Sequence, residues 1–155
     1  MSGDRTPAVL VHGIWMTGLE MALLGRRLAT CGLEPHFFHY KSLLRTPAQN
    51  ADRLAGFVRD LGPGCVNLVA HSLGGIVVLH MFDRFSDLPP GRVVLLGTPA
   101  NGSGVARTAA GRKWLRPLLG RSLPQGLSGG VPGWRGGREL GVLAGTGGVG
   151  IGRIL

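Results

Sequence analysis

The amino-acid sequence predicts an α/β fold, in which helices cover both faces of a parallel sheet. Short apolar runs, each of a length suited to one buried strand, alternate with longer segments whose apolar residues recur at helical spacing. The short runs are continuously apolar, which is typical of strands that are covered on both faces. A chain of 155 residues fits a single domain over residues 1–155.

Five segments are expected to form the sheet. Among the clearest are 8–12 (AVLVH), which ends at a glycine, and 92–96 (RVVLL). In chain order the strands are expected at 8–12, 35–40, 66–70, 92–96 and 140–144, joined by right-handed crossovers.

Three helices are expected between these strands. Residues 18–30 carry leucines at helical spacing, and residues 73–85 follow the third strand of the chain. The remaining helix begins in "TPAQ" at 46–49, a capping-box pattern with Thr46 as N-cap, and ends at Gly62.

Composition and charge exclude several classes of protein. The formal charge of +9 comes mostly from arginines that are scattered along the chain without a nucleic-acid-binding motif, so no nucleic-acid partner is expected. Cys31 and Cys65 lie in different elements without metal-ligand spacing and are expected to be free, buried thiols. No metal or organic cofactor is expected.

The chain shows no targeting or membrane-spanning pattern. Its first residues lack the apolar stretch and the cleavage site of a signal peptide. No run approaches the roughly 20 apolar residues that cross a bilayer. We therefore expect a cytoplasmic protein.

The segment "LVAHSLGG", residues 68–75, predicts a strand, a tight turn at Ser72 and a helix. A serine at such a turn needs small residues two positions before and after it, because the strained backbone crowds its neighbours. Ala70 and Gly74 meet this need, in the pattern A-x-S-x-G instead of the usual G-x-S-x-G. Ser72 is therefore a candidate nucleophile, and the alternative is a serine that only caps the following helix.

A second motif, His12-Gly13, ends the first strand. A loop at this point would aim the backbone N–H of Ile14 at a carbonyl group bound next to Ser72. Together with the backbone N–H of Leu73, it would form an oxyanion hole, in which removal of one donor typically costs about 10²–10³ in turnover.

At these motifs the sequence resembles the α/β-hydrolases, and among them small bacterial lipase- and esterase-like proteins. The resemblance rests on "VLVHGIW" (9–15), "LVAHSLGG" (68–75) and "VVLLGTPANGS" (93–103), and it extends loosely over 139–155. It implies a three-layer sheet of the α/β-hydrolase type, with the strands in the spatial order 35–40, 8–12, 66–70, 92–96 and 140–144. The resemblance further implies a nucleophilic role for Ser72. It also implies that the two amides named above are the oxyanion donors and that the His-Gly pair supports their loop.

The partners of the serine are missing from the chain. The family places the acid and the histidine of its catalytic triad after the serine. The only histidine after Ser72 is His80, eight residues along the same helix and therefore roughly 12 Å away along its axis. The resemblance implies that the acid and the base lie beyond Leu155, with a last strand and helix that this chain lacks.

Residues 103–138 are rich in Gly, Arg and Pro and are expected to form a cap or lid inserted before the last strand. Within this segment, residues 107–121 interleave basic and apolar side chains. That pattern suits either peripheral contact with an anionic membrane or a solvated cap over the site. Trp15 and Met16, after the oxyanion loop, are expected to line the substrate pocket, with a plain core role as the alternative.

Three functions are compatible with these observations. The leading interpretation is a serine hydrolase of the lipase or esterase type that acts on small-molecule or lipid esters and is almost inactive as this 155-residue chain. A non-catalytic interaction module that keeps the front part of the fold is the main alternative, and an acyltransferase with the same nucleophile is the third. The open edge of strand 140–144 is expected to pair with a second chain.

Overall fold

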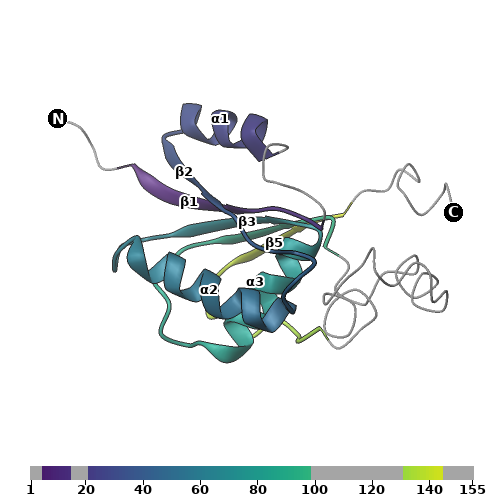
Figure 1. The fold of residues 1–155 in the computed structure, drawn as a ribbon. Coiled ribbons are helices and arrows are strands. Elements are labelled where there is room, and N and C mark those ends of the chain that lie inside the picture. The colour runs from purple at the N-terminus through teal and green to yellow at the C-terminus, as the bar shows by residue number, and fades with distance from the viewer. Residues whose placement is uncertain (1–4, 15–20, 99–130, 145–155) are drawn as a thin grey trace, which may run out of the picture.

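The computed structural model describes residues 5–14, 21–98 and 131–144 (Figure 1). In chain order the elements are β1 (Thr6–Val11), α1 (Ala22–Thr30), β2 (Leu33–Phe38), α2 (Pro47–Asp60), β3 (Asn67–His71), α3 (Leu73–Arg84), β4 (Val93–Leu96) and β5 (Leu140–Leu143). The strands and helices of these ranges alternate as the sequence predicts.

The strands form one five-stranded sheet in the order β2-β1-β3-β4-β5, and all neighbours are parallel. The expected order and direction are therefore confirmed. Val11 of β1 is level with Phe38 of β2 on one side and with Ala70 of β3 on the other. This register brings the carboxyl ends of the three strands to one edge of the sheet.

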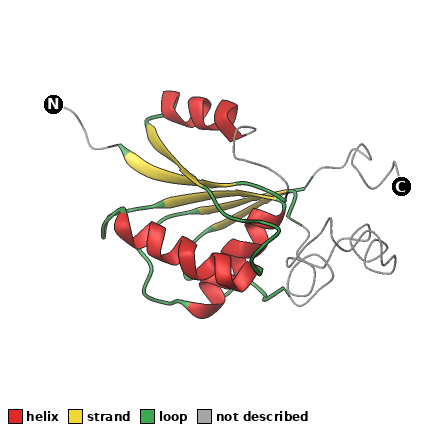
Figure 2. Ribbon diagram, viewed as in Figure 1, coloured by secondary structure: helices red, strands yellow, loops and turns green. Residues whose placement is uncertain are grey.

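Helices α2 and α3 cover one face of the sheet, and α1 covers part of the other (Figure 2). The two phenylalanines at the end of β2 show both contacts, because successive side chains of a strand point to opposite faces. Phe38 is buried and lies 5.4 Å from the Phe57 ring of α2. Phe37 faces α1, where a Cβ on Gly25 would lie 2.6 Å from its ring. The arrangement is the predicted three-layer fold.

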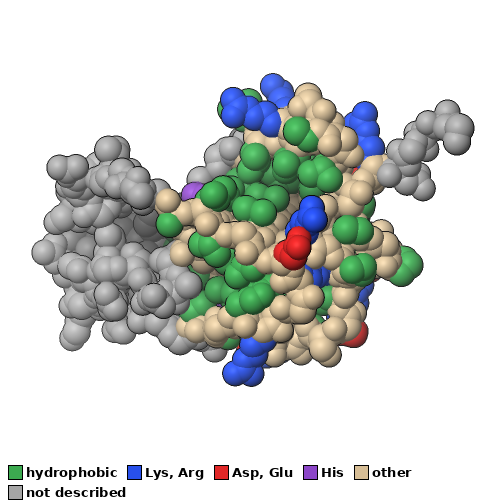
Figure 3. All heavy atoms as spheres, turned by 180° about the vertical axis from the view of Figure 1, so that it is seen from behind, with side chains coloured by type: hydrophobic (Ala, Val, Ile, Leu, Met, Phe, Trp, Pro, Cys, Tyr) green, Lys and Arg blue, Asp and Glu red, His purple; other side chains and the backbone are tan. Residues whose placement is uncertain are grey.

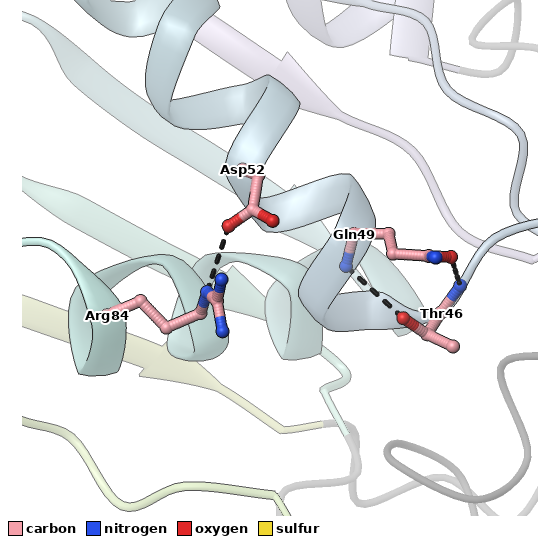
Figure 4. Close-up of polar contacts among 4 residues, drawn as sticks. All are labelled: Thr46, Gln49, Asp52 and Arg84. Carbon is pink, nitrogen blue, oxygen red and sulfur yellow. Dashed lines mark hydrogen bonds and ion pairs between the residues drawn. The ribbon is translucent and has the colours of Figure 1, made fainter.

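The start of α2 is the capping box that the sequence predicts (Figure 4). The Thr46 hydroxyl accepts a hydrogen bond from the Gln49 backbone N–H at 3.2 Å, and the Gln49 side-chain oxygen accepts one from the Thr46 N–H at 3.0 Å. Two donors that a helix start leaves unpaired are thereby satisfied. One turn further on, Asp52 forms an ion pair with Arg84 of α3 at 2.9 Å, which links the two helices.

The expectation of buried cysteines is wrong. Cys31 and Cys65 are free thiols, but both are exposed. Each lies in a connection between a helix and a strand, and such connections run over the surface of a domain. In the described ranges, none of the helices has the length and apolar character that a bilayer crossing requires.

Candidate active site

The turn between β3 and α3 holds Ser72 in a strained conformation. Its φ is 52° and its ψ is −120°, and within the described ranges no other non-glycine residue has a positive φ. Side chains rarely adopt this region, and they persist there only where the surrounding structure imposes it. The geometry is that of a serine at the apex of a sharp strand-to-helix turn.

Close packing around the turn explains its small residues. A Cβ on Gly74 would lie 2.5 Å from the carbonyl oxygens of both Val11 and His12. A Cβ on Gly75 would overlap the Thr98 side chain. The first turn of α3 therefore lies directly against the end of β1 at Gly74 and against Thr98, beyond β4, at Gly75.

Backbone hydrogen bonds hold Ser72 on both sides. Its N–H donates to the Leu96 carbonyl at the end of β4 at 2.9 Å, and its carbonyl accepts from the Gly75 N–H at 3.0 Å. The side chain forms no capping hydrogen bond with α3. Ser72 therefore stands at the N-cap position of α3 without capping the helix through its side chain, and the residue is partly exposed.

The loop after β1 is held from two directions by His12 and Tyr40. His12 is 2 % exposed, and its ring stacks on that of Tyr40 with 4.3 Å between centroids. The Tyr40 hydroxyl donates to the His12 carbonyl at 2.7 Å. His12 Nδ1 lies 2.8 Å from the Gly13 carbonyl oxygen, and since that oxygen only accepts, Nδ1 carries the hydrogen.

This contact sets the direction of the peptide that carries the Ile14 N–H. The described chain has no cis peptide bond, so the C=O of Gly13 and the N–H of Ile14 point in opposite directions. With the carbonyl bound to the His12 ring, the N–H is turned away from that ring. Tyr40 supports this loop, and sequence reasoning missed it; the available signal was its position two residues beyond the strand that pairs with β1.

All five histidines of the chain lie in described segments, and no hydrogen bond joins one of them to the Ser72 hydroxyl. His80 is buried in α3, as far along that helix as the sequence predicts. His36 lies 3.3 Å from the Glu34 carboxylate on β2. The His39 ring is 6.4 Å from that of His12.

His71 is the histidine next to the serine in sequence. Its Nδ1 is buried, and no described residue accepts or donates a hydrogen bond there. It precedes Ser72 at the end of β3, where the chain leaves the strand. The structure therefore brings Ser72, Leu73, His12, Gly13 and Ile14 to one edge of the sheet, and none of the five histidines is hydrogen-bonded to the serine there.

Several predicted residues cannot be placed. Trp15, Met16 and segment 107–121 lie outside the described residues, and of the expected cap 103–138 only 131–138 are described. Those residues form no helix or strand and pack against α3, where Trp134 meets Phe82 edge-on at 4.9 Å between ring centroids.

Comparison with known proteins adds the family context. No protein-family model matches the chain, and no curated protein matches it. Among solved structures it is similar to a mature lipase of Bacillus licheniformis, with a TM-score of 0.65 and 24% identity over 82% of this chain and 56% of that one.

Two further structures give the same result. A monoacylglycerol lipase of Paleococcus ferrophilus matches with a TM-score of 0.57 and 21% identity, over 70% of this chain and 49% of that one. A carboxylesterase structure from Nitrososphaera matches with a TM-score of 0.56 and 16% identity, over 71% and 46%. The chain thus spans about half the length of the structures that it matches. The five-stranded parallel sheet and these matches show that the chain has an α/β-hydrolase type of fold.

Proposed function

We propose that Ser72 is the nucleophile of a serine hydrolase that cleaves carboxylic esters, in a protein of the lipase or esterase type. The observation that carries the proposal is the φ of 52° at Ser72, on a turn that backbone contacts hold on both sides. Strain of this kind concentrates at active sites, because it keeps a reactive group projected in one direction. The lipase and esterase structures of similar fold support the same chemistry.

In the proposed reaction, Ser72 Oγ attacks the carbonyl carbon of the ester and the alcohol leaves, after which water releases the acid from the acyl-serine. Negative charge develops on the former carbonyl oxygen. The N–H groups of Leu73 and Ile14 are the proposed donors to that oxygen. The His12 contact with Gly13 supports this role for Ile14, because it holds the shared peptide in one orientation.

The general base and its acid partner are proposed to come from polypeptide outside these 155 residues. Support comes from the five histidines, none of which is hydrogen-bonded to Ser72 in the structure. Without a base, a serine hydroxyl is a weak nucleophile at neutral pH. The oxyanion hole and substrate binding alone leave about 10³–10⁴ over water in triad-deleted enzymes.

Substrate contacts are proposed for Trp15 and Met16, which follow the oxyanion loop, with small-molecule or lipid esters as substrates. For residues 107–121 we propose peripheral contact with an anionic lipid surface, on the strength of their interleaved basic and apolar side chains.

The test uses p-nitrophenyl esters and a fluorophosphonate label. The 155-residue chain should hydrolyse the esters barely above background and label slowly. Added imidazole, a small general base, should raise both rates. Ser72→Ala should abolish the increase, whereas Ser86→Ala, a change beyond the far end of α3, should not.

A longer chain with a downstream triad acid and histidine should restore turnover without imidazole. An equal response of the wild type and Ser72→Ala to imidazole would reject Ser72 as nucleophile. In that event the alternative of a non-catalytic module that keeps the fold would take precedence.

A further inference from the structure

The chain beyond β2 contacts the loop after β1, at the edge of the sheet where Ser72 lies. The pairing of these two strands ends where Val11 is level with Phe38. Just beyond this pair, the Tyr40 hydroxyl donates a hydrogen bond to the His12 carbonyl at 2.7 Å. Tyr40 is 8 % exposed, so this hydrogen bond is shielded from water. A buried side chain of one segment thereby binds the backbone of the neighbouring one.

Aromatic contacts hold the Tyr40 ring in place. It stacks on the His12 ring with 4.3 Å between centroids, and it lies 5.7 Å from the ring of Phe38. Phe38 in turn lies 5.4 Å from the Phe57 ring of α2. These contacts connect α2 with the loop after β1, and they restrict the movement of the Tyr40 hydroxyl away from the carbonyl that it binds.

The His12 carbonyl that accepts this hydrogen bond also lies against the first turn of α3. A Cβ on Gly74 would be 2.5 Å from its oxygen. Leu73, whose N–H is one of the two proposed oxyanion donors, directly precedes Gly74. Ile14, which carries the other donor, is two residues beyond His12. One carbonyl group therefore lies close to both parts of the proposed oxyanion hole.

The glycine between His12 and Ile14 makes the direction of the Ile14 N–H dependent on outside contacts. Gly13 has no Cβ, so the peptides on either side of it rotate at low energetic cost. The carbonyl of the first peptide is bound by Tyr40, and that of the second by the His12 ring. Tyr40 takes part in both contacts, because the His12 ring is stacked on it.

We propose that Tyr40 is a positioning residue of the oxyanion hole, which acts through the His12 carbonyl to fix the direction of the Ile14 N–H relative to the Leu73 N–H. The inference rests on the proposed function of Ser72, because the reaction at this serine is the one that uses the two donors. Loss of the Tyr40 hydroxyl alone would keep the ring and its stacking but release the peptide between His12 and Gly13. The Ile14 N–H would then point at the oxyanion for only part of the time.

The first experiment compares Tyr40→Phe with Val58→Ala, which opens a cavity at a fully buried position near the end of α2 that leads to the amino end of β3. Fluorophosphonate labelling in imidazole should be about tenfold slower for Tyr40→Phe, less than the roughly 10²–10³ lost with a whole donor. With p-nitrophenyl esters the loss should fall on kcat and leave KM within about twofold, because the oxyanion exists only in the transition state. Val58→Ala should be less stable but should label at the wild-type rate.

The second experiment exploits the fact that the chain contains a single tyrosine. Expression with difluorotyrosine alters Tyr40 alone, and the electron-withdrawing fluorines lower the pKa of a phenol. An ionised phenol cannot donate a hydrogen bond to the His12 carbonyl. The labelling rate of the fluorinated protein, divided by that of the ordinary protein, should therefore fall as absorbance shows the phenol to ionise. His12, His39 and Lys41, the titratable neighbours of Tyr40, are the same in both proteins, so the ratio cancels their effect.

The outcomes separate this inference from the proposed function. If Ser72→Ala labels as fast as the wild type, the proposed function fails and the inference fails with it. If labelling depends on Ser72 but Tyr40→Phe keeps the wild-type rate, the inference alone is overturned. Equal losses in Tyr40→Phe and Val58→Ala would also overturn it, because they would report stability instead of the direction of a peptide. Should Tyr40→Phe fail to fold, the fluorinated protein decides, and a rate ratio that stays constant while the phenol ionises would reject the role of the hydroxyl.

Discussion

Strands β3 and β5 belong to the same sheet but differ in how the chain surrounds them. In β3, Leu68 and Ala70 are completely buried and belong to the core that packs against α2 and α3. In β5, Val142 and Leu143 are 58% and 63% exposed, although they point to opposite faces of the sheet. At that position neither face of the edge strand is covered.

The two strands are therefore stabilised by different kinds of contact. β3 is held by side chains buried on its faces, and the strained turn at Ser72 depends on that packing. β5 is held by its backbone pairing with β4, by Leu140, which packs against the core, and by contacts just before the strand, such as that of Arg138 with the Val66 carbonyl. Figure 3 shows the molecule from behind, and hydrophobic side chains lie at the surface of the face that is seen there.

The same substitution in the two strands tests this contrast most strongly. Leu68→Ala removes a fully buried side chain and should lower the free energy of unfolding by about 2–5 kcal/mol. Leu143→Ala removes a side chain that is 63% exposed and should change it by less than about 0.5 kcal/mol. Urea unfolding of the two variants measures both values, and equal losses would mean that β5 is as well packed as β3.

The next largest difference in stability is expected between two glycine-to-alanine substitutions, one in α3 and one in β5. Gly74→Ala would place a Cβ 2.5 Å from two backbone oxygens at the end of β1, and should cost about 1–3 kcal/mol. Gly141→Ala in β5 meets nothing closer than Val94 Cγ2 at 3.7 Å. Because alanine restricts the unfolded chain more than glycine does, this control should be neutral or stabilising by about 0.5 kcal/mol. Thermal unfolding distinguishes the two, and a neutral Gly74→Ala would contradict the close approach of α3 to β1.

The sequence was sufficient to predict the strands and the turn at Ser72, because both depend on local patterns, whereas the order of the strands in the sheet came from the resemblance to the α/β-hydrolases. Continuous apolar runs mark the strands, and small residues at 70, 74 and 75 mark the turn. One strand is displaced by two residues: 35–40 was expected, whereas β2 spans Leu33–Phe38. Its pairing starts where Thr6 meets Leu33, and an edge strand tolerates the proline and the charge that weakened the apolar pattern.

Contacts between distant segments could not be predicted in this way. Tyr40 meets His12 because the register of β1 and β2 places the ends of the two strands side by side. Arg138 reaches the Val66 carbonyl across 72 positions of sequence, from a segment whose composition indicated only a cap. Neither contact produces a periodic pattern in the sequence that could reveal it. The exposure of Cys65 depends on the path of the loop between α2 and β3, which composition does not predict.

The exposed edge of β5 should mediate self-association. Its residues Leu140–Leu143 include no charge or proline, the devices that usually protect an edge strand from pairing. We expect the 155-residue chain to form dimers or larger species and Val142→Lys to suppress them, with a change in unfolding free energy below about 0.5 kcal/mol. Leu23→Lys is the matched control, because Leu23 is 60% exposed but lies on α1. Sedimentation velocity showing the same species for wild type and Val142→Lys would reject pairing through β5.

The smallest change in stability is expected for the ion pair of Arg59 with Asp87, which lies on the face of the sheet that α2 and α3 cover. The two side chains are 2.6 Å apart and connect α2 with the segment after α3. The hydrogen bond from Arg59 is the main cause of a lowered pKa at Asp87, whose ordinary value is 3.8. Because the folded carboxylate holds its proton less tightly than the unfolded one, its stabilisation is complete well above pH 3.8. It disappears as the pH falls below 3.8 through the lowered pKa.

Asp87→Asn should therefore be slightly less stable than the wild type at neutral pH and indistinguishable from it in strong acid. The effect stays small because the Asp87 side chain is 70% exposed and solvent screens the pair. Urea unfolding at a series of pH values measures the difference, and high salt should reduce it. In an Arg59→Gln background the pH-dependent effect of the same change should be smaller, because only the lesser, backbone hydrogen bond then lowers the pKa of Asp87. An unchanged effect would mean that Arg59 is not the main cause of the lowered pKa.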